Sequence, residues 1–128
     1  MTDQRHPDIE IYVKDCSVAE IEAWLTQIAE SCNCTFSQGV THEYKITLSG
    51  HTIPVMLHEK VAGKAWSSVW FKSDKTPWTV DLDCARVASE QLGKQVRCIA
   101  SGWQTGDDPD EWWKIEKGDE TLIQWVTA

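Results

Sequence analysis

The chain has 128 residues and a mass of 14.5 kDa, which is the size of one domain built around one hydrophobic core. Hydrophobic residues make up 41% and charged residues 25% of the sequence. This is ordinary globular usage, so it excludes a disordered chain or a fibrous repeat. Twelve Lys and Arg against twenty Asp and Glu give a formal net charge of −8. That charge argues against nucleic acid and against an anionic membrane surface as partners.

The start of the chain and the cysteines indicate a compartment. Residues 1–10 are polar and charged, and no apolar run approaches the ~20 residues of a membrane span. We therefore expect a cytoplasmic protein. Five cysteines, an odd number, lack the dense pattern of a secreted scaffold and are expected to be free thiols. A zinc site built from Cys32, Cys34, Cys84 and Cys98 is the alternative, but structural zinc sites usually supply two close ligand pairs. We expect no metal and no cofactor.

The first elements are a strand, a helix and a second strand. Residues 8–14 alternate between apolar and polar side chains, which predicts a strand. Ser17 and Glu20 have the spacing of a capping box and predict the start of a helix. Its apolar positions fall on one helical stripe: Val18, Ile21, Trp24, Leu25 and Ile28. Residues 34–38 then favour a short strand.

A β-hairpin is the clearest local pattern. A two-residue turn at Ser49-Gly50 makes cross-strand partners whose residue numbers sum to 99. The register places an apolar set on one face: His42, Tyr44, Ile46, Leu48, His51, Ile53, Val55 and Leu57. The other face is polar, so one face belongs to the core. Pro54 has no amide donor and indicates a sheet edge or a bulge on its side.

The second half begins with a strand that is apolar on both faces. Over residues 65–72, Val69 and Phe71 share one face, and Trp66 and Trp70 share the other. A strand of this kind is typical of the centre of a sheet, covered on both sides.

A second helix and three strands complete the chain. Thr76 as N-cap and Pro77 at the first helical position predict where this helix begins, and Gly93 predicts its end. A strand over 95–100 follows, and then a polar, acidic loop. The last hairpin joins residues 112–116 to 121–126.

The resulting fold class is α+β: one mainly antiparallel sheet with two helices, in the order β-α-β-β-β-β-α-β-β-β. We expect a single domain over residues 1–128, with a pseudo-repeat between 8–59 and 65–126. In this order of elements the chain resembles the paired βαβββ modules of the vicinal oxygen chelate superfamily, which includes glyoxalases and antibiotic-binding resistance proteins. The resemblance implies a metal bound on the first and last strands of each module, where this chain has Glu10 or Tyr12, His58 or Glu59, Ser68 or Trp70, and Gln124. A generic α+β sandwich remains the alternative.

Tryptophan is the most unusual part of the composition, with eight in the chain. Trp24, Trp78 and Trp125 are expected in the core. Trp112 and Trp113 are adjacent in a predicted strand, so they must point to opposite faces. Next to them, an acidic loop carries four carboxylates within residues 107–111. The candidate binding residues are therefore aromatic and acidic: Trp66, Trp70, Trp103, Asp107, Asp108, Asp110, Trp112 and Trp113.

Asp81 falls inside the apolar stripe of the second helix, near its N-terminus. The helix dipole or a partner such as Arg97 would stabilise a carboxylate there. No Ser-His-Asp, Cys-His, phosphate-loop or HExxH pattern is present in the sequence, and we therefore expect no catalytic residues.

These observations favour a small acidic protein-binding module without catalytic activity, of the immunity, inhibitor or adaptor type. Its partner is expected to be a protein with a basic surface. The alternative is a small-molecule binding protein or a metal-dependent enzyme of the paired-module architecture, with a pocket lined by Tyr12, Trp66, Trp70 and Gln124. A homodimer that buries exposed tryptophan is a third hypothesis.

Overall fold

The computed structural model describes residues 6–100 and 110–125. It contains eight strands and two helices within these ranges: β1 (Ile9–Lys14), α1 (Val18–Ile28), β2 (Ser31–Gln38), β3 (Thr41–Leu48), β4 (His51–Glu59), β5 (Trp66–Phe71), α2 (Asp81–Leu92), β6 (Val96–Ile99), β7 (Glu111–Glu116) and β8 (Asp119–Gln124). The α+β fold class and the predicted order of elements are confirmed.

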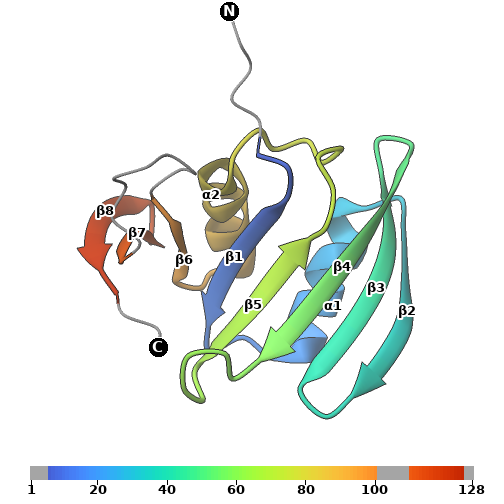
Figure 1. Cartoon of the computed structure of the whole chain (residues 1–128), viewed down its shortest axis with the longest axis horizontal. Coiled ribbons are helices and arrows are strands. Elements are labelled where there is room, and N and C mark those ends of the chain that lie inside the picture. The colour runs from blue at the N-terminus through green and yellow to red at the C-terminus, as the bar shows by residue number, and fades with distance from the viewer. Residues whose placement is uncertain (1–5, 101–109, 126–128) are drawn as a thin grey trace, which may run out of the picture.

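All eight strands form one antiparallel sheet in the order β2-β3-β4-β5-β1-β6-β7-β8. Both helices lie on the same face of this sheet, behind it in Figure 1, with α1 behind β3 to β5 and α2 behind β1 and β6. We call the other side, which faces the viewer, the open face. No helix of the described residues is long and apolar enough to cross a membrane.

The two halves of the chain meet at the centre of the sheet. β1 of the first half pairs along its whole length with β5 of the second half. In the first half the strand that follows the helix, β2, is the outermost strand; in the second half the corresponding strand, β6, lies next to the centre. The shared order of elements therefore leads to two different placements in space.

The hydrophobic core lies between the sheet and the two helices. Its largest fully buried side chains come from both halves of the chain: Trp24, Tyr44, Phe71, Ile9, Ile11, Ile21, Leu25, Ile46, Ile53 and Leu57. Trp24 of α1 stacks on Trp78 with ring centroids 6.4 Å apart, and both rings meet Phe71 edge-on. The expectation that Trp24 and Trp78 belong to the core is confirmed.

The local predictions for α1 and the β3–β4 hairpin hold in detail. Ser17 accepts a hydrogen bond from the Glu20 amide, and the Glu20 carboxylate accepts one from the Ser17 amide, each at 3.1 Å. In the β3–β4 hairpin the residue numbers of each cross-strand pair sum to 99, from Thr41↔His58 to Leu48↔His51. Ser49 and Gly50 have positive φ angles of 51° and 81°, as a type I′ turn requires.

Two predicted element starts are wrong by three residues or more. β2 begins at Ser31, not at residue 34, because α1 ends at Ile28 and the chain pairs at once with β3, with the Ser31 and Thr47 hydroxyls 2.9 Å apart. α2 begins at Asp81, four residues after Pro77. Before it, the Thr76 hydroxyl donates to the carbonyl of Trp78, and Trp78 enters the core. Tertiary packing therefore overrides the local helix signal.

Pro54 does not mark an outer strand, because β4 lies inside the sheet. Its carbonyl faces β5 and accepts a hydrogen bond from the amide of Lys72, one residue after β5 ends. In an antiparallel strand the nitrogen of a residue lies on the same side as its carbonyl. Pro54 therefore lacks its N–H donor at the position where the pairing between β4 and β5 ends.

Candidate binding surface on the open face of the sheet

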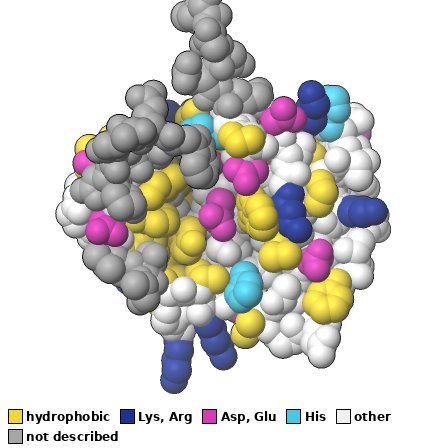
Figure 2. Space-filling view, viewed as in Figure 1, with side chains coloured by type: hydrophobic (Ala, Val, Ile, Leu, Met, Phe, Trp, Pro, Cys, Tyr) yellow, Lys and Arg dark blue, Asp and Glu magenta, His cyan; other side chains and the backbone are white. Residues whose placement is uncertain are grey.

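The open face carries an aromatic cluster, which we define as Tyr12, Trp66, Trp112 and Trp125. On β1 the residues Ile9, Ile11 and Val13 face the helices, so Tyr12 between them faces the other way. Cross-strand pairing places Trp66 on the same face as Tyr12, and β7 contributes Trp112. In Figure 2 hydrophobic side chains gather over this part of the face, whereas the side over β2 and β3 is mostly polar.

The rings of the aromatic cluster contact one another closely. Tyr12 meets Trp112 and Trp125 edge-on, with ring centroids 5.2 Å and 5.6 Å apart. Trp125 is 4.9 Å from Trp112 and 4.7 Å from Trp66. Trp66 and Trp112 are each only 7% exposed. The expectation that Trp125 belongs to the core is wrong: this residue follows β8 and lies on the open face.

One polar atom of this cluster is unsatisfied. The indole nitrogen of Trp112 is buried and has no hydrogen-bond partner in the described part of the chain. A buried donor without an acceptor costs about 1–3 kcal/mol.

The predicted binding residues fall in different places. Trp66 and Trp112 belong to the aromatic cluster, and Trp70 lies further along β5 on the same face, half-buried. Trp113 points to the helix side and packs against the core. The carbonyl of Asp110 accepts a hydrogen bond from the Trp125 amide. Three further candidates lie outside the described residues: Trp103, Asp107 and Asp108.

A group of carboxylates lies beside Trp70. The Trp70 indole donates to Asp8 at 2.8 Å, and a small cavity of about 210 Å³ is lined by Asp8, Glu10, Asp81, Trp70 and Ile99. Within the described ranges, no Lys or Arg forms an ion pair with any of these three carboxylates. This end of the open face is therefore negative and partly aromatic.

The sequence suggested Arg97 as a partner of Asp81, but the two residues do not pair in the structure. Its carboxylate accepts a hydrogen bond from the Glu10 amide at 3.2 Å and lies 3.4 Å from Nδ1 of His6. Burial raises the pKa of Asp81, while the bond from Glu10 and the nearby His6 oppose that rise. Burial also raises the pKa of Glu10, and Asp81 and Asp8 add to it by repulsion.

Asp81→Asn is expected to stabilise the protein at pH 7. An acid with a raised folded-state pKa lowers stability as pH rises from about 4 through that pKa, and the loss persists at neutral pH. The amide oxygen still accepts from Glu10 but carries no charge. The gain should therefore disappear near pH 3.5, below the ordinary Asp pKa of about 3.9. Urea unfolding of both proteins at the two pH values measures this.

Asp81→Leu is the matched control for that experiment. Leucine has a similar size but cannot accept the hydrogen bond from Glu10, so it should cost about 1–3 kcal/mol at both pH values. Equal destabilisation by Asn and Leu at pH 7 would contradict the assigned cause.

The four ligand positions implied by the resemblance do not converge. β4, β5 and β1 are neighbours, with Tyr12 and His58 each paired to Ser68. Gln124 lies on β8, at the far edge of the sheet beyond β6 and β7. No group of three or more His, Cys, Asp or Glu suited to hold a metal ion occurs among the described residues. Cys16, Cys84 and Cys98 are buried free thiols, as expected, and Cys34 is exposed.

The structure also joins three polar residues that the sequence did not connect. Ser37 is 2.6 Å from Nδ1 of His42, and Nε2 of His42 is 2.9 Å from Glu59. An ionised carboxylate only accepts, so Nε2 of His42 donates to Glu59, and the Ser37 hydroxyl is the hydrogen-bond partner of Nδ1. These residues line neither the cavity beside Trp70 nor the larger cavity at the end of α2, and we interpret this chain of bonds as a tie between β2, β3 and β4. In the sequence, only the adjacency of the predicted strands and the His42↔Leu57 register indicated that these three residues would meet.

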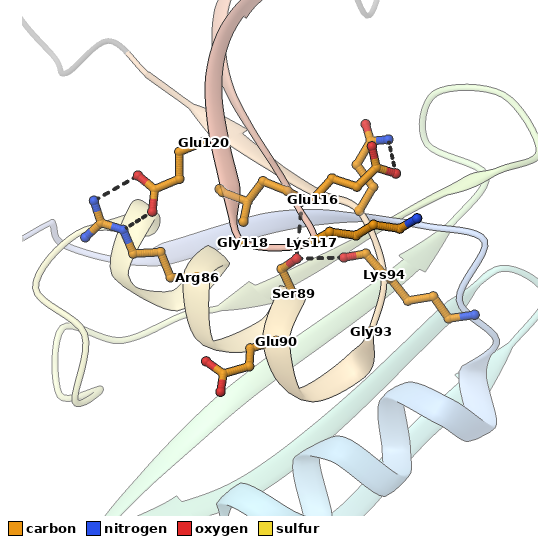
Figure 3. Close-up of a pocket in the computed structure, with 11 residues that line it drawn as sticks. Arg86, Ser89, Glu90, Gly93, Lys94, Glu116, Lys117, Gly118 and Glu120 are labelled. Atoms are coloured by element: carbon orange, nitrogen blue, oxygen red, sulfur yellow. Dashed lines mark hydrogen bonds and ion pairs between the residues drawn. The ribbon is translucent and has the colours of Figure 1, made fainter.

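The larger cavity lies apart from the open face. It has a volume of about 550 Å³ and lies between the end of α2 and the β7–β8 turn. Figure 3 shows Arg86 of α2 reaching Glu120 of β8 on one side, and Ser89 bonded to the carbonyl of Lys94 on another. Ile115 lies at its apolar side.

Together the fold and these surfaces define a class: an α+β protein whose single antiparallel sheet has both helices on one face and an aromatic cluster on the other. Comparisons with protein-family models, with curated proteins and with solved structures give no match to this chain. The function must therefore be argued from the open face itself.

Proposed function

We propose that this protein is a non-catalytic protein-binding module of the immunity, inhibitor or adaptor type, and that its open face is the docking surface. One observation carries the proposal. The helices of the described chain cover only one face of the sheet, yet the other face bears a dense aromatic set around Tyr12. Aromatic residues and arginine are enriched at the energetic centres of protein interfaces.

Charge supports a partner with a basic surface. The chain has a formal charge of −8, and Asp8, Glu10 and Asp81 lie together at one end of the open face without a Lys or Arg ion pair among the described residues. Lysine or arginine side chains of a partner would relieve the repulsion from Asp81 and Asp8, which adds to the effect of burial in raising the pKa of Glu10. Opposite charges also speed the encounter of two proteins.

The test compares two variants with one surface mutation each. Ile99→Lys places a charge on the open face between the carboxylates and Trp112, whereas Glu90→Lys makes a charge change on the helix side. A partner recovered from the native host is purified and titrated against each protein by calorimetry. Ile99→Lys should weaken binding at least tenfold, about 1.4 kcal/mol, and Glu90→Lys should leave it nearly unchanged.

Salt provides an independent measurement. Affinity should fall as salt rises, and Asp108→Lys in the acidic loop should weaken it further. Equal affinity of wild type and Ile99→Lys, or binding insensitive to salt, would count against this docking surface.

The cavity beside α2 favours a second candidate function, the binding of a small molecule. Its volume of about 550 Å³ falls within the range of ligand sites. Glu90→Trp would place an indole at its rim. A compound that raises the melting temperature of wild type but not of Glu90→Trp would support this function; a screen in which both proteins respond alike would argue against it.

A further inference from the structure

Arg97 is a feature of the open face that a purely acidic docking surface does not explain. It lies on β6, paired with Tyr12 on one side and Lys114 on the other. Its guanidinium carbon is 4.6 Å from the centroid of the Trp66 ring and 4.5 Å from that of Trp125. The two indoles therefore hold the guanidinium in place at the aromatic cluster.

The guanidinium has donors to spare. Its Nε donates to the side chain of Gln95 at 2.9 Å, and Gln95 in turn donates to Glu116. No acceptor among the described residues binds its two terminal nitrogens, and no described carboxylate forms an ion pair with it. Among the described residues, the outer side of the guanidinium is therefore held in place but has no acceptor.

Arg86 provides a comparison within the same protein, because its guanidinium is hydrogen-bonded to carboxylates. Its Nε and one terminal nitrogen bind both carboxylate oxygens of Glu120, at 2.7 Å and 3.1 Å. The other terminal nitrogen lies 3.4 Å from Asp83. Although the chain has twenty acidic residues, Arg97 has no such partner in the part of it that the structure describes.

The surroundings of Arg97 are locally positive. Cross-strand pairing and alternation put Lys14 and Lys114 on the same face. Among the described residues Lys14 has no ion pair, and Lys114 has only a long one, 3.9 Å to Glu116. The buried indole N–H of Trp112 is a further donor without a described acceptor in the same aromatic cluster. Donors and positive charge therefore exceed acceptors among the described residues at this place.

We propose that Arg97 is a recognition site for a carboxylate, and that this carboxylate is an Asp or Glu side chain of the partner protein. A carboxylate matches the planar fork of arginine with two parallel hydrogen bonds. Contact with two indoles removes water from the guanidinium beforehand, so less reorganisation is needed on binding. The inference rests on the proposed function: it adds that the partner's basic surface presents an acidic residue opposite Arg97.

The experiment uses the capped residue N-acetyl-glutamate methylamide as the probe and the corresponding glutamine compound as its neutral control. Both are titrated into the whole protein at low salt and followed by proton–nitrogen NMR at the Arg97 Nε–H and the Trp112 indole N–H. We expect a saturable, dose-dependent shift of both signals with the glutamate probe, and none with glutamine. N-acetyl-alanine forms a third arm, which reports a terminal carboxylate instead.

Variants assign the site. Arg97→Lys keeps the charge but loses the fork, and should weaken the response at least tenfold, whereas Arg86→Gln should leave it unchanged. Similar shifts with glutamate and glutamine, an Arg97→Lys protein that responds like wild type, or stronger binding of N-acetyl-alanine than of the glutamate probe would overturn the proposal. If the probe fails while Ile99→Lys still weakens partner binding, the carboxylate site is wrong and the docking surface stands. If the probe binds and Ile99→Lys has no effect on partner binding, Arg97 binds a carboxylate, but the docking surface is wrong and so is the assignment of that carboxylate to the partner.

Discussion

Replacing Trp24 by alanine is expected to lower the free energy of unfolding by about 3–5 kcal/mol, the usual cost of removing a large buried aromatic side chain. Trp24 is 2% exposed and contacts both Trp78 and Phe71. Its indole N–H also donates to Gln91 of α2 at 2.7 Å, so one side chain links the two helices and the sheet. Chemical denaturation monitored by circular dichroism measures the loss.

Trp24→Phe separates packing from hydrogen bonding in that prediction. Phenylalanine retains most of the ring contacts but removes the donor to Gln91, which is exposed and can bind water instead. We therefore expect a loss of about 0.5–1.5 kcal/mol, the net value of one hydrogen bond. A loss below about 1 kcal/mol for Trp24→Ala would show that the link between the helices does not hold the core together.

The second large effect is expected from Trp66→Ala on the open face. Trp66 is 7% exposed, contacts Trp125 and supports the guanidinium of Arg97. Its loss should cost about 3 kcal/mol of stability and also disorder Arg97. The half-buried Trp70 makes fewer contacts, a hydrogen bond to Asp8 and a contact with Lys72. Trp70→Ala should cost about 1 kcal/mol while weakening partner binding.

The two tryptophan variants therefore distinguish a structural role from a binding role on one face. Thermal unfolding and partner titration are measured on both proteins. If Trp70→Ala destabilises as much as Trp66→Ala without affecting the partner, then the open face serves mainly as a second small core.

The sequence predicted most of the local structure. The Ser17–Glu20 capping box and the register of the β3–β4 hairpin depend on residues at most 17 apart along the chain. Trp66–Phe71 was expected at the centre of the sheet, covered on both sides, because both of its faces are apolar. It lies at the centre, but the helices of the described chain cover only one of its faces (Figure 1). The adjacent Trp112 and Trp113 point to opposite faces, as the two-residue period of a strand requires.

The sequence failed where contacts between distant segments outweigh local signals. The helix signal at Thr76-Pro77 is sound by itself, but burying Trp78 against Trp24 and Phe71 keeps this segment out of the helix. Similarly, Asp81 forms hydrogen bonds with His6 and with the Glu10 amide, which lie 75 and 71 positions earlier in the chain. No pattern of spacing reveals such pairs.

By itself, the sequence determined the fold class, the order of elements, the main hairpin and the surplus of acidic and tryptophan residues. These properties follow from hydrophobic periodicity, turn chemistry and composition, which act over a few residues. Only the tertiary structure decided that Tyr12, Trp66, Trp125 and Arg97 meet on the face of the sheet opposite the helices. Their meeting depends on strand order, with β1 placed between β5 and β6, and strand order is set by the packing free energy of the whole sheet against its helices.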